Sequence, residues 1–223
     1  MPEIPNHARL IVVLGMARSG TTIFTYVLCR HPQIALFREG PEAWLLENDC
    51  LPRRQAGRIG RAAGLFPEAT YVVLKRPWQE EHAEWLHQQL PRARFIVLLR
   101  DREAIKRSWA TTGRWALDDR PQALTDPDAC YDAYLKHAMR LPEVVGGERC
   151  RTIRYERMVQ QPKAVFEELA DWLGVERRFD CTPIGNGLHW RCELAEEFPH
   201  GDALLDGPRP AESPPAAGEH HPQ

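Results

Sequence analysis

Short runs of apolar residues alternate along the chain with segments whose apolar residues recur at helical spacing. The runs that predict buried strands are Leu10–Leu14, Tyr71–Leu74, Arg94–Leu99 and Arg151–Tyr155, with a shorter apolar piece at Ile34–Phe37. Helical spacing predicts helices over Thr21–Arg30, Glu80–Leu90, Glu103–Leu117, Asp128–Leu141 and Pro162–Leu173. Strands alternating with helices are typical of a three-layer α/β fold, in which helices flank a central parallel sheet.

The loop after the first strand has the layout of a phosphate-binding loop. Gly15 and Gly20 lie at its two ends, and the first helix is predicted to begin at Thr21. Such a turn directs backbone N–H groups at an anion on a helix N-terminus, which predicts a P-loop-containing nucleotide-binding type of fold. The ATP-binding version has Lys where Thr21 stands, and Arg18 is the only cation inside this loop. The loop is therefore suited to phosphate but lacks the usual means of opening a β–γ bond.

Three further polar residues are expected at the same edge of the sheet. Lys75 and Arg100 directly follow predicted strands, and Ser108 lies about two helical turns after Arg100. Ligands of parallel α/β sheets bind at the carboxyl ends of the strands. The sequence thus predicts two anion pockets, one at the loop and one at Arg100 and Ser108. A nucleotide with phosphates at both ends fits this arrangement better than ATP does.

Three segments in this order resemble the sulfotransferases that use 3′-phosphoadenosine 5′-phosphosulfate (PAPS): GMARSGTT, FIVLLRDREAIKRSW and RYERMVQQPKAVFEELADWLGV. The resemblance covers most of residues 9–175. It implies that the loop binds the 5′-phosphosulfate, that Arg100 and Ser108 bind the 3′-phosphate, and that the segment from Tyr155 closes the nucleotide site. The loop residues it implies as nucleotide-binding are Gly15, Ala17, Arg18, Ser19, Gly20, Thr21 and Thr22.

The pattern is most similar to tyrosylprotein sulfotransferases and related bacterial sulfotransferases. The shared order is ARSGTT, then His31-Pro32-Gln33-Ile34, then Arg38-Glu39. This resemblance implies that Glu39 is the catalytic base and that Lys75 is a catalytic lysine. The chain differs from the subgroup in having Ala17 for the loop proline and Arg38 in the acidic pair. Glu42 and His82 stay open as alternative bases.

The reaction expected from the resemblance is in-line transfer of a sulfuryl group from PAPS to an acceptor hydroxyl, with PAP as product. Glu39 would take the acceptor proton, while Lys75 and Arg18 would neutralise charge on the leaving 5′-phosphate oxygen. No metal is required. The expected acceptor is a small molecule, lipid or glycan. Two alternatives stay open, a P-loop kinase of a small substrate and a non-catalytic nucleotide-binding module.

Composition and charge limit the partners and the cellular location that we expect for this chain. The 223 residues carry 29 basic and 31 acidic side chains, so the chain lacks the positive charge that duplex nucleic acid attracts. No apolar run approaches the ~18 residues of a membrane span, and the N-terminus shows no signal peptide, which predicts a cytoplasmic protein. The six cysteines form no C-x-x-C pair and are expected to be reduced. We expect a single domain over residues 1–198, a disordered tail over residues 199–223, and possible homo-oligomers.

Overall fold

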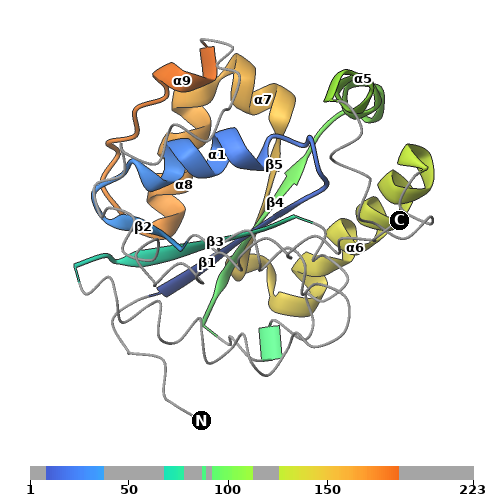
Figure 1. Ribbon diagram of the computed structural model, residues 1–223. Helices are drawn as coiled ribbons and strands as arrows, with labels where there is room; N and C mark the ends of the chain where they lie inside the picture. Colours follow the sequence, from blue (N-terminus) through green and yellow to red (C-terminus); the bar gives the residue numbers. More distant parts are fainter. Residues whose placement is uncertain (1–8, 38–67, 78–86, 89–91, 113–125, 186–223) are drawn as a thin grey trace, which may run out of the picture.

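A five-stranded parallel sheet forms the centre of the molecule (Figure 1). The computed structural model describes residues 9–37, 68–77, 87–88, 92–112 and 126–185. The strands are β1 (Arg9–Gly15), β2 (Ile34–Phe37), β3 (Tyr71–Pro77), β4 (Arg94–Leu99) and β5 (Cys150–Arg154). Their order is β2-β3-β1-β4-β5, so β1 lies at the centre, with β3 on one side and β4 on the other. The connections therefore diverge at the end of β1, where sheets of this kind bind ligands.

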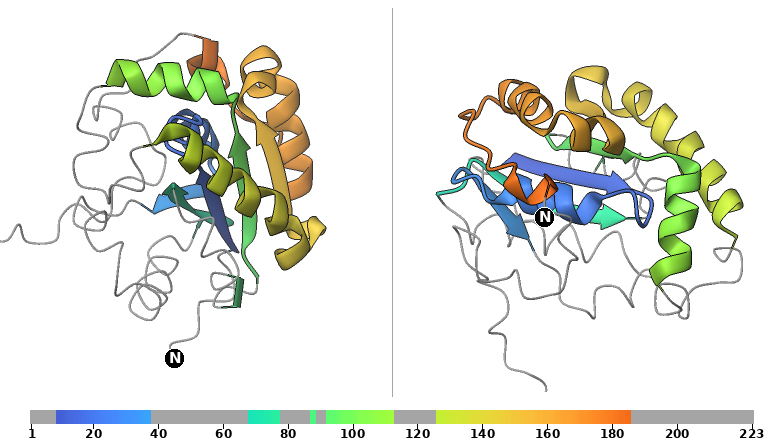
Figure 2. Two further views of the ribbon diagram at one scale, coloured as in Figure 1. Left: turned by 90° about the vertical axis from the view of Figure 1, so that its right-hand side faces the viewer. Right: turned by 90° about the horizontal axis from the view of Figure 1, so that it is seen from above.

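Helices cover both faces of the sheet (Figure 2). They are α1 (Thr21–Cys29), α5 (Arg102–Thr112), α6 (Pro127–Val145), α7 (Tyr155–Gln160), α8 (Pro162–Leu173) and α9 (Thr182–Gly185), with a 3-10 turn at Gly147–Arg149. Residues of α5 and α6 pack on one face of the sheet, and residues of α1 and α8 pack on the other. No helix in these described ranges combines the length and apolar character needed to cross a membrane.

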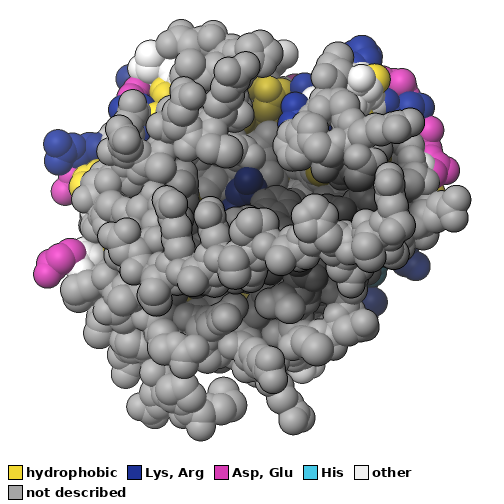
Figure 3. Space-filling view, viewed as in Figure 1, with side chains coloured by type: hydrophobic (Ala, Val, Ile, Leu, Met, Phe, Trp, Pro, Cys, Tyr) yellow, Lys and Arg dark blue, Asp and Glu magenta, His cyan; other side chains and the backbone are white. Residues whose placement is uncertain are grey.

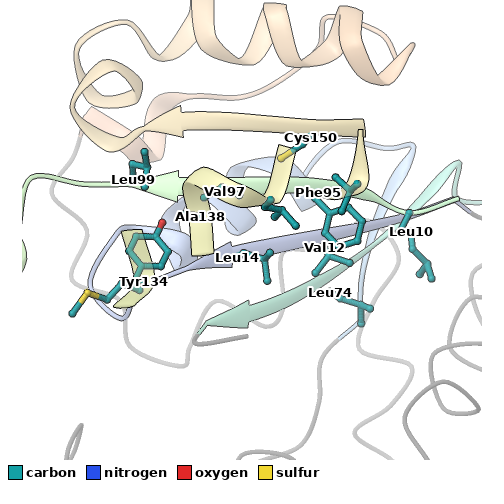
Figure 4. Packing of buried hydrophobic residues seen from close by; sticks show 14 of the residues in the cluster. Leu10, Val12, Leu14, Leu74, Phe95, Val97, Leu99, Tyr134, Ala138 and Cys150 are labelled. Carbon is teal, nitrogen blue, oxygen red and sulfur yellow. The ribbon is translucent and has the colours of Figure 1, made fainter. Parts of the chain in front are cut away.

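The alternation of side chains along the strands produces two separate apolar cores. In β1, Leu10, Val12 and Leu14 face the core that includes α6, whereas Ile11 and Val13 face the core that includes α1 and α8. Figure 4 shows the first core, where side chains of α6 lie against β1 and β4. Burial on both faces accounts for strands that read as continuous apolar runs.

The structure confirms the predicted fold class and most of the predicted elements. Helix α8 has the predicted bounds, and Gly174 caps it with a left-handed φ of 71°. Helix α6 begins at Pro127, one residue before the predicted Asp128, with Asp126 accepting hydrogen bonds from Asp128 N and Ala129 N. The predicted helix over 80–90, the part of the 103–117 helix beyond Thr112, and the 199–223 tail lie outside the described residues.

Three predicted boundaries are wrong. Strand β3 does not end at Leu74 but continues to Pro77, so Lys75 lies within the strand and not directly after it. Helix α6 does not end at Leu141 but continues through Pro142 to Val145. Leu141 and Val145 are both buried one turn apart, so tertiary packing outweighs the helix-breaking tendency of the proline. Tyr155 is not the end of a strand, because it is the first residue of the short helix α7.

Candidate nucleotide site

The loop between β1 and α1 has two residues in the left-handed conformation, Arg18 with φ 71° and Gly20 with φ 89°. The turn is closed by Ser19, whose N–H donates to Met16 O at 3.0 Å. A Cβ at Gly20 would lie 2.3 Å from ring carbon Cδ2 of Tyr155, so that position requires glycine for its backbone and for this contact. Tyr155 therefore packs directly on the loop, which is where the resemblance places the closing segment.

The first turn of α1 is arranged to receive an anion. Gly20 occupies the N-cap position and supplies no capping side chain to the helix N–H groups. The Ser19 hydroxyl, which precedes it, is fully buried and has no hydrogen-bond partner among the described atoms. Unpaired N–H groups, the helix dipole and a buried hydroxyl together form a site that suits phosphate or sulfate oxygens.

Arg100, at the end of β4, contacts this loop directly. One terminal nitrogen donates to the carbonyl oxygen of Arg18 at 2.7 Å. Its guanidinium carbon lies 4.2 Å from the ring centroid of Tyr155. Its Nε is buried without a partner in the described part of the chain. Arg100 is thus held in place by the loop and by Tyr155 while one donor is left unused.

Arg18 links the loop to α5. Its Nε donates to the hydroxyl of Ser108 at 2.9 Å. Burial, followed by the charge of Arg100, lowers the pKa of the Arg18 guanidinium below its ordinary value. In the same helix, Trp109 Nε1 donates to Ala17 O at 3.2 Å. Two like charges held close together favour an anion between or beside them.

Lys75 approaches the loop from the other side. Its Nζ donates to Thr22 Oγ1 at 2.9 Å, which joins the end of β3 to the first turn of α1. Thr22 is exposed, whereas Thr21 is buried. Basic side-chain atoms are visible in the space-filling view where this face is hollowed between α7 and α5 (Figure 3).

The structure thus gathers most of the predicted site residues at one sheet edge. These are Gly15, Ala17, Arg18, Ser19, Gly20, Thr21, Thr22, Lys75, Arg100, Ser108 and Tyr155. The residues predicted for the two anion pockets adjoin each other, because Arg18 contacts both Arg100 and Ser108. The expected base Glu39 and the alternatives Glu42 and His82 lie outside the described residues.

Three residues that contact this group were not singled out from the sequence. Trp109 contacts the loop, and Tyr131 and Glu156 contact the peptide unit that follows Arg100. The motif could have indicated Glu156, since this residue follows Tyr155 in RYERM. Tyr131 lies in an ordinary amphipathic helix and carries no local signal. His31, part of the family pattern, is a buried residue that contacts Gln33 and Glu176.

The donors present fit a ligand that carries two anionic groups. Arg18, Arg100 and Lys75 supply cations, and the buried Ser19 hydroxyl and Arg100 Nε are polar atoms left without protein partners among the described residues. Buried polar groups are normally paired, and Ser19 adjoins Arg18 in the loop, so these two atoms suit a polar ligand. Thr25 Oγ1 and His87 Nδ1 are also buried without a partner among the described atoms. Within the described ranges, no group of three or more His, Cys, Asp or Glu side chains is placed to hold a metal ion.

Comparison with protein families matches residues 58–180 to the family described as "Sulfotransferase family". Among curated proteins, the chain is 24% identical over 196 residues to protein-tyrosine sulfotransferase A of Caenorhabditis elegans, covering 74% of this chain and 50% of that protein. The chain thus spans about half the length of the curated relatives it matches.

Solved structures show the same fold. A sulfotransferase of Mycobacterium avium has a TM-score of 0.59 at 17% identity, covering 81% of this chain and 67% of that one. A mouse sulfotransferase in complex with PAP has a TM-score of 0.50 at 16% identity, covering 75% and 60%. The family match includes Lys75, Arg100, Ser108 and Tyr155 but begins after the loop.

Proposed function

Because the chain belongs to the sulfotransferase family, we propose that it moves the sulfuryl group of PAPS to an acceptor hydroxyl, with PAP as the product. The observation that carries this proposal is the contact of Arg100 with the phosphate-type loop, at 2.7 Å from Arg18 O. It joins a cation suited to one phosphate to a loop suited to the other. An ATP site would need only the loop, with a lysine where Thr21 stands.

The residues divide into two groups around the proposed nucleotide. Loop N–H groups, the N-terminus of α1, Arg18 and Lys75 would hold the 5′-phosphosulfate and stabilise charge on the 5′-phosphate oxygen as the S–O bond breaks. Arg100 and Ser108 would hold the 3′-phosphate, with Tyr155 packed against Arg100. PAPS itself supplies an activated sulfuryl group, so the protein contributes positioning and electrostatic stabilisation and needs no metal.

Glu39 is proposed to accept the proton of the acceptor hydroxyl as the new S–O bond forms, a role worth roughly 10²–10⁴-fold in rate. Replacement of Glu39 by Gln is expected to abolish turnover while nucleotide affinity stays close to that of the wild type. Transfer of labelled sulfate and calorimetric binding of PAP measure the two effects. Equal loss of both would exclude Glu39 as the base.

The nucleotide is tested by thermal shift with two ligands, PAP without metal and ATP with magnesium. PAP is expected to raise the Tm, since a ligand at 100 times its Kd stabilises by about 2.7 kcal/mol. Stabilisation by ATP and magnesium alone would overturn the proposal in favour of a kinase. A chain that binds PAP but transfers sulfate to no acceptor hydroxyl would be a binding module.

The acceptor is proposed to be a hydroxyl of a small molecule, lipid or glycan. Ala17 in place of the loop proline and Arg38 in the acidic pair set the chain apart from the tyrosine-modifying pattern. The single domain over residues 1–198, the cytoplasmic location and the formation of homo-oligomers stay predictions. A screen of acceptor hydroxyls with labelled PAPS identifies the substrate class.

A further inference from the structure

The peptide unit that joins Arg100 to Asp101 is held at both of its polar atoms. The hydroxyl of Tyr131, on α6, donates to the carbonyl oxygen of Arg100 at 3.0 Å. The Asp101 N–H donates to Oε1 of Glu156, on α7, at 2.9 Å. Two helices that are remote in sequence from β4 therefore hold one peptide plane from opposite ends.

This peptide unit lies just beyond the sheet. The register between β4 and β5 ends at Leu99 paired with Arg154, so Arg100 and Asp101 follow the last strand pair. Buried or partly buried backbone groups need hydrogen-bond partners. Beyond the last strand pair, two side chains supply these hydrogen bonds in place of a neighbouring strand. The orientation of the plane in turn sets the direction in which the Arg100 side chain leaves the backbone.

The Arg100 side chain also contacts the first residue of α7. Its guanidinium stacks on Tyr155, the residue before Glu156, and donates to Arg18 O. We propose that Tyr131 and Glu156 are positioning residues that fix the Arg100–Asp101 peptide and so aim Arg100 at the 3′-phosphate. This inference rests on the proposed function, because it assumes that Arg100 binds that phosphate.

The surroundings of Tyr131 keep its hydroxyl in the donating form. Burial raises the pKa of the phenol above its ordinary value. The Arg102 guanidinium carbon lies 4.7 Å from the Tyr131 ring centroid, and Arg102 also pairs with Asp128 at 3.5 Å and with Asp132. Arg102, held by these two carboxylates, therefore lies over the Tyr131 ring and restricts its movement.

The test compares the affinity of each variant for PAP and for 5′-AMP, which lacks the 3′-phosphate. Tyr131→Phe and Glu156→Leu are expected to lower the ratio of the two affinities by roughly five- to tenfold, which is about the net contribution of one ordinary hydrogen bond. Affinity for 5′-AMP is expected to stay within about twofold, since removal of one distant hydrogen bond leaves the loop contacts in place. Glu156→Gln keeps an oxygen acceptor, so it is expected to restore the wild-type ratio.

Tyr134→Phe is the matched control. Tyr134 lies one turn further along α6 and donates its hydroxyl to Leu98 O, also on β4, and Figure 4 shows its oxygen directed toward that strand. The same atom is removed from the same helix without touching the Arg100–Asp101 peptide. The control is expected to lower Tm but to keep the wild-type ratio.

Two outcomes would overturn the positioning role: an unchanged ratio in both Tyr131→Phe and Glu156→Leu, or an equal loss in Tyr134→Phe. A wild-type protein that does not distinguish PAP from 5′-AMP would instead overturn the proposed function. In that case, hydrogen exchange of the Asp101 amide tests the positioning role independently of the proposed function. Slow exchange in the wild type that accelerates in Glu156→Leu supports it, and unchanged exchange refutes it.

Discussion

Strand β4 begins with one arginine, Arg94, and is followed by another, Arg100, and the two are used in opposite ways. Arg94 begins the strand at what we call the base edge, and its guanidinium carbon lies 5.6 Å from the Tyr71 ring and 5.0 Å from the Trp172 ring. It also donates to Trp172 O. Arg100 follows the strand at the opposite edge, which we call the loop edge, and also stacks on an aromatic ring.

The difference is not a buried unpaired atom as such, since His87 Nδ1 is also one among the described residues, but the gathering of such atoms beside Arg18 and Arg100. The base edge is tied by backbone contacts, including Tyr71 OH to Leu173 O at 2.6 Å. At the loop edge, Arg100 Nε and the Ser19 hydroxyl are buried without partners among the described atoms, and Arg18 has a left-handed backbone. Strain and unpaired groups of this kind reduce stability and are retained where a ligand completes them. The comparison teaches that the base edge serves the fold and the loop edge serves binding.

The variant Arg100→Leu is the strongest test of whether the loop edge serves binding and the base edge serves the fold. We expect affinity for PAP to fall by about 100-fold or more, since charge-assisted hydrogen bonds contribute about 1.5–3 kcal/mol each. The Tm should change little, because loss of the bond to Arg18 O and of the Tyr155 contact is offset by removal of a buried unpaired nitrogen. Calorimetric titration and thermal melting measure the two quantities. A large fall in Tm with PAP affinity retained would reverse the assignment.

The matched change at the other end of the strand is Arg94→Leu. It should lower the free energy of unfolding by about 2 kcal/mol, through loss of two cation–π contacts and a hydrogen bond. PAP affinity of the folded protein should stay at the wild-type value. Urea denaturation gives the first quantity and calorimetry the second. Loss of affinity without loss of stability would show that the base edge takes part in binding.

A smaller effect is expected from His31, which joins the end of α1 to the segment after α8. Its Nδ1 accepts from Gln33 N at 3.1 Å, so Nε2 is the donor to Glu176 O at 2.9 Å, and the ring is neutral. Burial lowers the pKa of His31 below its ordinary 6.5. The unfolded chain therefore takes the proton first, and stability falls as pH drops below about 6.5.

The variant His31→Gln removes this titration. Its free energy of unfolding should be lower at pH 7, since two hydrogen bonds change, but it should decline less between pH 7 and pH 5. Chemical denaturation at several pH values provides the comparison. Parallel curves for the wild type and the variant would show that His31 does not contribute to the pH dependence.

Local patterns were enough to predict the sheet and the loop edge. The loop and Arg100 were found because each follows an apolar strand, and parallel strands end at a common edge. Helix α8 was predicted with its bounds because an amphipathic pattern lies between Pro162 and Gly174. These features depend on neighbours in sequence.

What the sequence did not predict depends on contacts between distant segments. The Tyr131 hydroxyl meets Arg100 O only because α6 packs across the end of β4, and nothing around Tyr131 in the sequence marks that meeting. The pairing of Arg94 with Trp172 likewise joins β4 to α8. Helix α6 passes Pro142 because buried Val145 belongs to the core. The proposed base, Glu39, lies outside the described residues and stays a prediction.

The order of the strands has a consequence for how the protein is made. Strand β1 is central, yet both of its partners come later in the chain, with Arg9 paired to Tyr71 and Ile11 paired to Arg94. During synthesis, this strongly apolar segment leaves the ribosome long before either partner exists. Non-local parallel pairing is slow, and an unpaired apolar strand is prone to aggregate. We therefore expect the nascent chain to need chaperone protection until Leu99 has emerged.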